Sequence, residues 1–220
     1  MEKFSEKFSH IDTWVFDLDN TLYDAEAHVF VECGRRMTDF VARHLGLEHE
    51  QAAKIRKDYY LKYGTTLRGL MTEHGVPPDD FLEEVHSIDI SPVEVCTLTR
   101  DNLSRLPGRK FVFTNAPRGF AERMTEHLCI RNHFDAIFAI EDADYWPKPH
   151  MPTYEIFLKK FGIDPTAACM FEDMQVNLKP AHDLGMTTVW FHGSDTPPDH
   201  PHVHHQSEKL SRWISENLHK

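Results

Sequence analysis

Short apolar segments alternate with helical patterns along the second half of the chain, and this alternation limits the fold more than any other feature. Residues 110–114, 134–140, 167–171 and 186–191 read as buried strands, and the segments between them carry apolar residues at helical spacing. Residues 13–18 add an apolar strand near the N-terminus. Strands that alternate with helices predict an α/β fold, with a parallel sheet covered by helices on both faces.

The helices between these strands have recognisable ends. One is expected from Pro117, a residue suited to the first helical turn, to about residue 129. A second spans 153–161 with Thr153 as its N-cap, and a third spans 176–184 and ends at Gly185. Further along, the Pro- and His-rich residues 192–205 read as a loop or tail, and 207–218 as a closing helix.

A long helical block interrupts the series after the first strand. Residues 25–106 carry apolar residues at helical spacing, and Gly46, Gly64 and Gly75 divide them into several short helices. We expect this block to be an insertion that forms a helical cap over the sheet. The predicted core domain is therefore discontinuous, comprising 1–24 and 107–220, and the predicted cap domain comprises 25–106.

The charge of the chain argues against two classes of partner. A formal net charge of -11 disfavours nucleic acid and anionic membranes. If the substrate is an anion, a metal ion or a well-placed lysine must make its site locally positive.

Cysteine usage and the N-terminus favour a cytoplasmic protein. The four cysteines are scattered without a CxxC pair, which is typical of reduced thiols rather than of a disulfide framework. The first twelve residues lack the apolar core of a signal peptide, and no apolar run approaches the roughly 20 residues that span a bilayer.

Two carboxylates, Asp17 and Asp19, follow the first strand in the segment VFDLDNTL. Such acids at the end of an apolar strand are unfavourable unless a ligand binds them, and Mg²⁺ prefers oxygen ligands. One carboxylate is then available as a nucleophile that forms a covalent phosphoryl intermediate. The other can protonate the leaving alcohol and later activate water.

A second acidic pair, Glu172 and Asp173, follows the strand at 167–171. Asp173 is expected to complete the Mg²⁺ shell, with Glu172 acting directly or through a water. Asn177, on the following helix, is expected to support this loop.

Two further motifs supply groups for a phosphate. Thr114 and Asn115 lie between a strand end and a helix N-terminus, so hydroxyl, amide and backbone N–H groups can all donate. Lys148 lies between two prolines on a stiff backbone, where it can neutralise both a phosphate and the nucleophilic carboxylate. All four motifs follow predicted strands, at the edge where open α/β sheets place their ligands.

Each motif alone also has a structural interpretation. Acidic loops can be solvated, acids can stabilise a helix N-terminus, a threonine can cap a helix, and a lysine can lie in a turn. These interpretations lose weight together, because four close carboxylates without a cation would have raised pKa values and would destabilise the fold. A bound Mg²⁺ together with Lys148 resolves this repulsion.

The segment FDLDNTL at 16–22 resembles the first motif of the haloacid dehalogenase (HAD) superfamily. Thr114, Lys148 and the pair Glu172-Asp173 match its second, third and fourth motifs in order, so the resemblance covers nearly the whole chain. The superfamily implies a Rossmann-like core with a cap inserted after the first strand.

The resemblance also implies roles. Asp17 would be the nucleophile and a Mg²⁺ ligand, and Asp19 the general acid/base, with its backbone carbonyl also on the metal. Thr114 and Lys148 would hold phosphate, and Asp173 would ligate Mg²⁺. Because dehalogenases of the superfamily lack a carboxylate at the place of Asp19, the resemblance favours phosphate transfer over carbon–halogen cleavage.

The inserted block looks like that of the pyrimidine 5'-nucleotidase subfamily at 63–70 (YGTTLRGL) and 85–89 (VHSID), and residues 114–116 and 148–154 are similar too. This subfamily dephosphorylates nucleoside 5'-monophosphates such as UMP and CMP, which become the expected substrates. Met174 departs from the pattern, being bulkier than the small polar residue expected after the acidic pair.

Substrate choice in this architecture lies in the cap. The candidates for contacting the nucleoside or steering the phosphate are Tyr63, Thr65, Thr66 and His86. The alternative is that Tyr63 and the threonines only cap and pack a short helix, with Gly64 permitting the turn.

Three functions remain open on the sequence alone. The first is a nucleotide phosphomonoesterase. The second is a phosphatase or phosphomutase for another small ester, such as a sugar phosphate or phosphoglycolate. The third is a catalytically silent binding protein, against which the intact acids and Lys148 argue.

The His cluster at 200–205 suggests adventitious metal binding in a tail rather than a zinc site. The sequence leaves the oligomeric state undecided.

Overall fold

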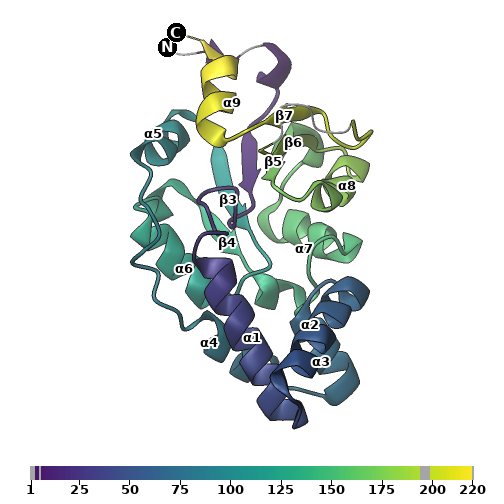
Figure 1. Cartoon of the computed structure of the whole chain (residues 1–220). Helices are drawn as coiled ribbons and strands as arrows, with labels where there is room; N and C mark the ends of the chain where they lie inside the picture. Colours follow the sequence, from purple (N-terminus) through teal and green to yellow (C-terminus); the bar gives the residue numbers. More distant parts are fainter. Residues whose placement is uncertain (1–2, 5, 194–198, 220) are drawn as a thin grey trace.

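A six-stranded sheet forms the centre of the molecule. The structure is a computed structural model that describes residues 3–4, 6–193 and 199–219. The strands lie in the order β4-β3-β2-β5-β6-β7, and every neighbouring pair is parallel (Figure 1). Their bounds are β2 (Thr13–Phe16), β3 (Arg109–Phe113), β4 (Ala136–Phe138), β5 (Ala168–Glu172), β6 (Thr187–Phe191) and β7 (His205–Ser207). The predicted parallel sheet is confirmed.

The strand register aligns the motifs. In β2, Phe16 pairs with Val112 of β3 on one side and with Phe171 of β5 on the other. The chain runs to one side of β2 through β3 and to the other side through β5, so β2 is the point where the strand order reverses. The residues that follow β2, β3 and β5 therefore emerge together at one edge of the sheet.

Helices cover both faces, as predicted. Side chains alternate along β2, so Trp14 and Phe16 pack toward α6 (Arg118–His127) and α9 (Leu210–Asn217), whereas Val15 packs toward α7 (Met151–Phe161) and α8 (Gln175–Asp183). Two buried clusters result, one on each side of the sheet. Burial of these apolar side chains holds the sheet and its helices together.

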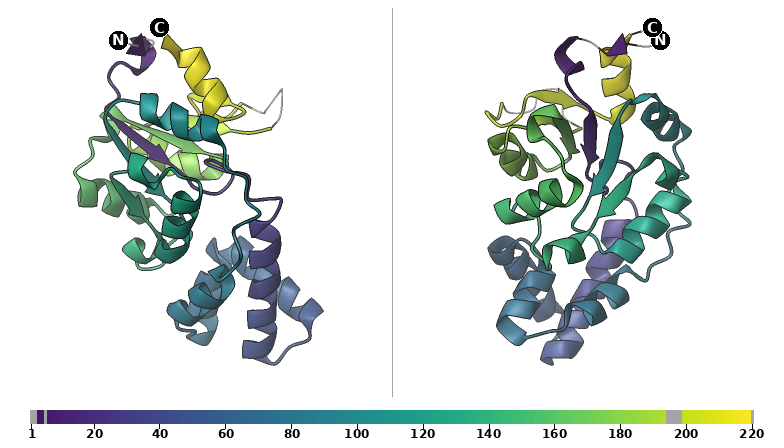
Figure 2. Two further views of the ribbon diagram at one scale, coloured as in Figure 1. Left: turned by 90° about the vertical axis from the view of Figure 1, so that its left-hand side faces the viewer. Right: turned by 180° about the vertical axis from the view of Figure 1, so that it is seen from behind.

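All regular elements between β2 and β3 are helices, as the helical spacing predicted. They are α1 (Val29–Leu45), α2 (His49–Tyr63), α3 (Thr66–His74), α4 (Pro78–His86) and α5 (Thr97–Arg105). Gly46, Gly64 and Gly75 each follow a helix with a left-handed φ, which glycine adopts without steric cost. Figure 2 shows α1–α4 standing beyond the edge of the sheet, while α5 packs against α9. The division into core and cap domains remains a proposal.

A strand lies where the expected loop or tail at 192–205 meets the expected closing helix at 207–218. β7 (His205–Ser207) pairs with β6, and nearby the Thr188 hydroxyl donates to the carbonyl of His202 at 2.8 Å. A short polar strand at a sheet edge forms through backbone bonds and leaves no apolar pattern in the sequence. Residues 194–198 of the expected tail lie outside the described residues.

The start of α7 also differs from the prediction. The helix begins at Met151 with His150 at the N-cap position, and the Thr153 hydroxyl donates instead to the carbonyl of Trp146 at 3.0 Å. Pro152 in the first turn suits an earlier start, because its fixed φ is helical and its missing N–H is not needed there.

The remaining elements are short. β1 (Lys3–Phe4) pairs antiparallel with β8 (Leu218–His219), so the two ends of the chain lie together (Figure 1). Single 3-10 turns occur at Glu6–Phe8, Arg131–His133, Ile140–Ala143 and Pro165–Ala167. Among the described residues, no helix has both the length and the apolar character needed to cross a bilayer.

Candidate active site

Asp17 stands where β2 leaves the sheet. Its backbone N–H donates to the carbonyl of Phe171 in the neighbouring strand at 3.0 Å, which fixes the start of the loop. The residue is only 6% exposed. One carboxylate oxygen accepts from Lys148 Nζ at 2.7 Å, and the other accepts from the Thr21 hydroxyl at 3.2 Å.

Lys148 is the buried cation of the site. It is 2% exposed, and besides Asp17 its ammonium donates to Glu172 Oε1 at 2.8 Å and to the Phe113 carbonyl at 2.9 Å. Three acceptors match the three hydrogens of an ammonium group. A buried charge is tolerated only when it is paired and hydrogen-bonded in this way.

Glu172 ends β5 and is 1% exposed. Its Oε1 also accepts from Asn177 Nδ2 of α8 at 2.6 Å, and its Oε2 accepts from the Met174 backbone N–H at 2.9 Å. The side chain is thereby held from the strand, the loop and the following helix. Asn177 acts on the loop through Glu172.

Three carboxylates are close enough to share a metal ion. Asp17, Glu172 and Asp173 each offer an oxygen, and these oxygens lie within 4.8 Å of one another. Hard oxygen donors at the edge of a sheet fit Mg²⁺, which binds one or two carboxylates and keeps several waters. The residues present therefore fit the expected metal. Asp19 contributes no side-chain oxygen to this group.

Crowding of acids changes their protonation. Burial, and then the charge of Glu172, raises the pKa of Asp17 to about 7, although Lys148 opposes this shift. Burial and the charge of Glu172 likewise raise the pKa of Asp173 to about 8. A cation between the two carboxyl groups would stabilise their ionised forms and so lower both pKa values.

In the ion pair of Lys148 and Glu172, the pKa values are instead shifted toward the charged form of each group. Burial by itself would raise the pKa of Glu172, but the Lys148 charge and several hydrogen bonds bring that pKa below its ordinary value. Burial would also lower the pKa of Lys148, yet the charges of Asp17 and Glu172 hold it above its ordinary value. Glu172 is therefore the ionised partner of the buried ammonium.

Thr114 and Asn115 follow β3, as expected, but they have different surroundings. The Thr114 hydroxyl accepts from the Ala116 backbone N–H at 3.0 Å, at the entry to α6. The Asn115 carboxamide bonds both backbone groups of Lys148, accepting from its N–H at 2.7 Å and donating to its carbonyl at 3.3 Å. Asn115 thus fixes the lysine backbone, a contact that the sequence did not predict.

The Asp19 side chain points to a partner that the sequence analysis missed. The Tyr23 hydroxyl donates to Asp19 Oδ1, and the two residues also form a backbone bridge. Removal from water raises the pKa of Asp19, and the hydrogen bond from Tyr23 works against this shift. The four-residue spacing within the motif was the available signal, but the sequence analysis did not single out Tyr23.

Tyr63 and Thr65 lie at the α2–α3 turn and bond within the insertion. The Tyr63 hydroxyl donates to Glu73, and the Thr65 hydroxyl accepts from the Arg68 backbone N–H at 3.1 Å as the N-cap of α3. Neither side chain is hydrogen-bonded to the acid–lysine group. The capping alternative raised for the sequence describes these contacts.

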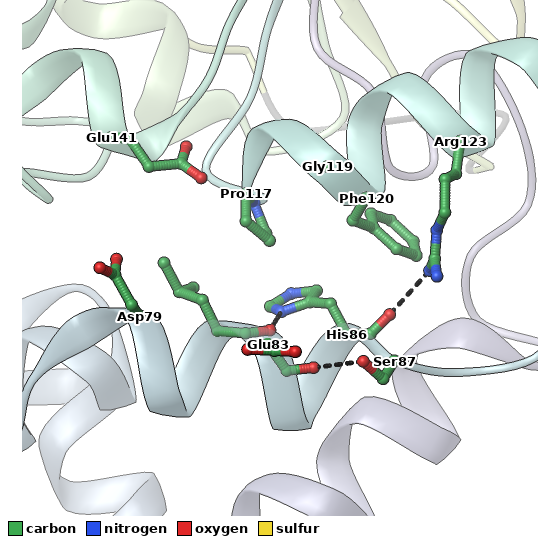
Figure 3. Close-up of a pocket in the computed structure, with 10 residues that line it drawn as sticks. Asp79, Glu83, His86, Ser87, Pro117, Gly119, Phe120, Arg123 and Glu141 are labelled. Carbon is green, nitrogen blue, oxygen red and sulfur yellow. Dashed lines mark hydrogen bonds between the residues drawn. The ribbon is translucent and has the colours of Figure 1, made fainter.

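Thr66 and His86 line two different hollows. Thr66 is buried and donates to the Arg56 carbonyl at 3.3 Å, beside a cavity of about 330 Å³ between α1, α2 and α3. His86 lines a crevice of about 340 Å³ between α4 and α6, where its ring lies beside Phe120 (Figure 3). Burial lowers the pKa of His86 to about 4.

Other residues of the insertion approach the sheet edge more closely. The Tyr60 hydroxyl lies 3.9 Å from Met174 Sδ, next to the acidic pair. The Arg68 guanidinium lies 3.5 Å above the Trp146 ring, just before Lys148 in the chain. Neither Tyr60 nor Arg68 was a sequence candidate, although Arg68 lies in the segment 63–70, because on a helix only the packing decides which side chain faces the core.

Two proteins are similar in sequence to most of this chain. Over 193 residues it is 25% identical to phosphate metabolism protein 8 of Saccharomyces cerevisiae, a match covering 79% of this chain and 59% of that protein. Over 182 residues it is 26% identical to the fructose-1-phosphate phosphatase YqaB of Escherichia coli, covering 80% of this chain and 93% of that protein.

A solved structure has the same fold. The HAD phosphatase from Thermococcus onnurineus superposes with a TM-score of 0.66 at 16% identity, covering 94% of this chain and 97% of that one. The family model for haloacid dehalogenase-like hydrolases matches residues 14–191, from β2 through β6. These residues include every motif at the sheet edge, and the chain therefore belongs to the haloacid dehalogenase-like hydrolase family.

Proposed function

We propose that the protein is a Mg²⁺-dependent phosphomonoesterase that works through an aspartyl-phosphate on Asp17. The observation that carries this proposal is the buried Lys148 ammonium, which bonds Asp17 at 2.7 Å and Glu172 at 2.8 Å beside a third acid, Asp173. A nucleophilic carboxylate, a fixed cation and oxygen ligands for a metal are the groups that phosphoryl transfer needs.

In the first step, a carboxylate oxygen of Asp17 forms a bond to phosphorus while the ester P–O bond breaks. The electron pair of that bond passes to the leaving oxygen, which takes a proton from the Asp19 carboxyl. Asp19 can do this because burial raises the pKa of its carboxyl, which favours the protonated form. The products are an alcohol and phosphorylated Asp17.

In the second step, the Asp19 carboxylate takes a proton from water as the water oxygen bonds to phosphorus. The bond between phosphorus and Asp17 breaks, which releases phosphate and restores the Asp17 carboxylate and the protonated Asp19 carboxyl. Lys148 balances the charge on Asp17 and on the phosphoryl group. We propose that the Thr114 hydroxyl and nearby backbone N–H groups donate to phosphate oxygens. Asp17, Asp173 and Glu172 would hold Mg²⁺, which would supply further positive charge to the phosphoryl group when bound.

For the substrate, we propose pyrimidine nucleoside 5'-monophosphates such as UMP and CMP. The support is the resemblance of residues 63–70 and 85–89 to the nucleotidase subfamily. Sugar phosphates are the second candidate, because the matched relative from Escherichia coli is named a fructose-1-phosphate phosphatase. We further propose residues 25–106 as the cap domain that selects among them, and the cytoplasm as the location, which suits four free cysteines.

The test is phosphate release from UMP, CMP, AMP, fructose 1-phosphate and phosphoglycolate, with Mg²⁺ and with a chelator. Wild type is compared with Asp17→Asn, which removes the nucleophile with little change of shape. Asp24→Asn is the matched control, because Asp24 is an exposed acid of the same loop.

Release that depends on Mg²⁺, favours UMP and CMP, and disappears only in Asp17→Asn is the expected result. Preference for fructose 1-phosphate would keep the mechanism and replace the substrate. Release that persists in Asp17→Asn would refute the nucleophile. No release from any ester would favour a silent binding protein.

A further inference from the structure

Tyr23 closes the loop that carries the catalytic acids. Its side chain is 9% exposed and packs in the core cluster on the α6 side of the sheet. Its hydroxyl donates to Asp19 Oδ1. Among the described residues, this is the one side-chain hydrogen bond made by the Tyr23 hydroxyl or by the Asp19 carboxyl.

The backbone fixes this contact in place. The Leu22 N–H donates to the Leu18 carbonyl at 3.0 Å, and Asp19 and Tyr23 form a bridge across the turn. Asn20 adopts a φ of 59°, a left-handed value that asparagine tolerates, and its side-chain oxygen accepts from the Ala25 N–H at 2.9 Å. The tyrosine is thus held by its ring and by the turn.

Asp19 differs from the other acids in what orients it. Asp17 and Glu172 are held by Lys148, and Asp173 shares their metal-binding group. Asp19 makes no bond to Lys148 and lies outside that group, so Tyr23 is the group that determines where its carboxyl points. An acid/base catalyst works only when it lies within hydrogen-bond reach of the proton it moves.

We propose that Tyr23 is a positioning residue that aims the Asp19 carboxyl at the leaving oxygen of the substrate. This inference rests on the proposed function, in which Asp19 gives a proton to that oxygen and later takes one from water. Tyr23 touches neither substrate nor metal and acts through Asp19.

The proposal predicts a dependence on the leaving group. An alkyl oxygen needs a proton as its bond to phosphorus breaks, whereas 4-nitrophenolate leaves without one. A misaimed Asp19 therefore slows attack on an alkyl phosphate more than attack on 4-nitrophenyl phosphate. It slows the hydrolysis of phosphorylated Asp17 equally for both, because that step no longer contains the leaving group.

The experiment measures kcat/KM for an alkyl ester (UMP or the best substrate found) and for 4-nitrophenyl phosphate. Tyr23→Phe keeps the ring and removes only the hydroxyl. Asp19→Asn reports the full acid/base contribution. Tyr59→Phe is the matched control, because it also removes a bonded hydroxyl, here the one 2.6 Å from His74 Nε2 in the insertion.

We expect Tyr23→Phe to lower kcat/KM about 10-fold for the alkyl ester and less than about 2-fold for the aryl ester, a fraction of the roughly 100-fold or larger loss in Asp19→Asn. We also expect Tyr23→Phe to show a burst of nitrophenol near one equivalent per site, since hydrolysis of the intermediate becomes slow. Tyr59→Phe should do neither. Thermal unfolding of each variant checks that it is folded.

Equal losses on both esters in Tyr23→Phe, or no loss at all, would overturn the positioning role if Asp19→Asn still shows the leaving-group dependence. If Asp19→Asn lacks that dependence, the acid/base assignment in the proposed function is wrong instead. The two failures are therefore distinguishable.

Discussion

The edge of the sheet and the inserted helices use polar side chains in different ways. At the edge, Lys148 bonds Asp17 from a position 131 residues away in the chain. In the insertion, the Thr65 hydroxyl bonds a group three residues away, and His86 Nδ1 bonds the Leu82 carbonyl four residues away. Polar groups from different strands are brought together only by the tertiary fold. Polar groups a few residues apart on one helix form hydrogen bonds that stabilise that helix.

This difference bears on which residues we propose to carry chemistry. Burying Asp17, Glu172 and Lys148 together costs desolvation energy that folding does not need to spend, so a bound ligand is the reason to keep them. Capping a helix with Thr65 stabilises the protein directly. The comparison therefore supports our proposal of catalysis at the sheet edge. The contacts seen for Tyr63, Thr65, Thr66 and His86 are those of residues that cap and pack helices.

The largest expected effect is at Lys148. Lys148→Met should lower kcat/KM by about 1000-fold, because the developing phosphoryl charge loses a fixed cation. It should also lower the free energy of unfolding by about 3 kcal/mol, because two buried carboxylates lose their partner. Steady-state kinetics and urea unfolding measure both effects.

The control for this change is Lys179→Met, which breaks an exposed helical pair with Asp183. It should cost less than about 0.5 kcal/mol. If Lys148→Met were equally mild, the contrast between the two regions would fail.

The next effect is a pH dependence of the metal-free protein. The pKa values of Asp17 and Asp173 are raised to about 7 and about 8 from an ordinary value of 3.8. The folded state therefore binds these protons more tightly than the unfolded state. As a result, stability falls as pH rises from the ordinary pKa of 3.8 to about 8. The Tm in a chelator should drop by several degrees, and added Mg²⁺ should restore it at the alkaline end.

The double variant Asp17→Asn with Asp173→Asn should flatten this profile and lose the response to Mg²⁺. His86 supplies the contrasting sign from the other region. Its pKa is lowered to about 4 by burial, so its contribution to stability is lost as pH falls from its ordinary value of 6.5 through about 4. A profile of the double variant that still falls with rising pH would contradict the assignment to the acidic pair.

A smaller effect is expected at Asn115. Asn115→Ala removes both hydrogen bonds to the Lys148 backbone, so the ammonium should shift and kcat should fall about 10-fold. Inhibition by inorganic phosphate should change little, because the carboxamide faces the lysine backbone. A large rise in the phosphate inhibition constant would instead make Asn115 a phosphate ligand, as the sequence suggested.

The smallest effect is expected at Tyr63. Tyr63→Phe removes an exposed hydrogen bond to Glu73 and should change KM for UMP by less than about 2-fold. Substrate titration of the variant measures this. A KM raised about 10-fold would show that Tyr63 reaches the nucleoside when substrate is bound, and the comparison between edge and insertion would need revision.

The catalytic edge could be read from the sequence because parallel sheets obey a simple rule. Three motifs directly follow an apolar strand, and Lys148 follows one after a turn and a loop. The carboxyl ends of parallel strands meet at one edge. Asp17, Thr114, Lys148 and Glu172 could thus be placed near one another without knowledge of any contact. The alternation of strands and helices fixed the fold class for the same reason, although the polar strand β7 escaped because backbone pairing alone leaves no periodic signal.

Only the tertiary structure decided which groups orient the side chains of the site and which face of the insertion packs nearest to it. That Asn115 holds the Lys148 backbone and that Tyr23 holds Asp19 depend on loop geometry, which the residue types do not encode. That Tyr60 approaches Met174, while Tyr63 turns to Glu73, depends on how α2 packs. The parallel sheet follows from the chain's pattern, but the rotation of a helix against its neighbours is set by packing over the whole molecule.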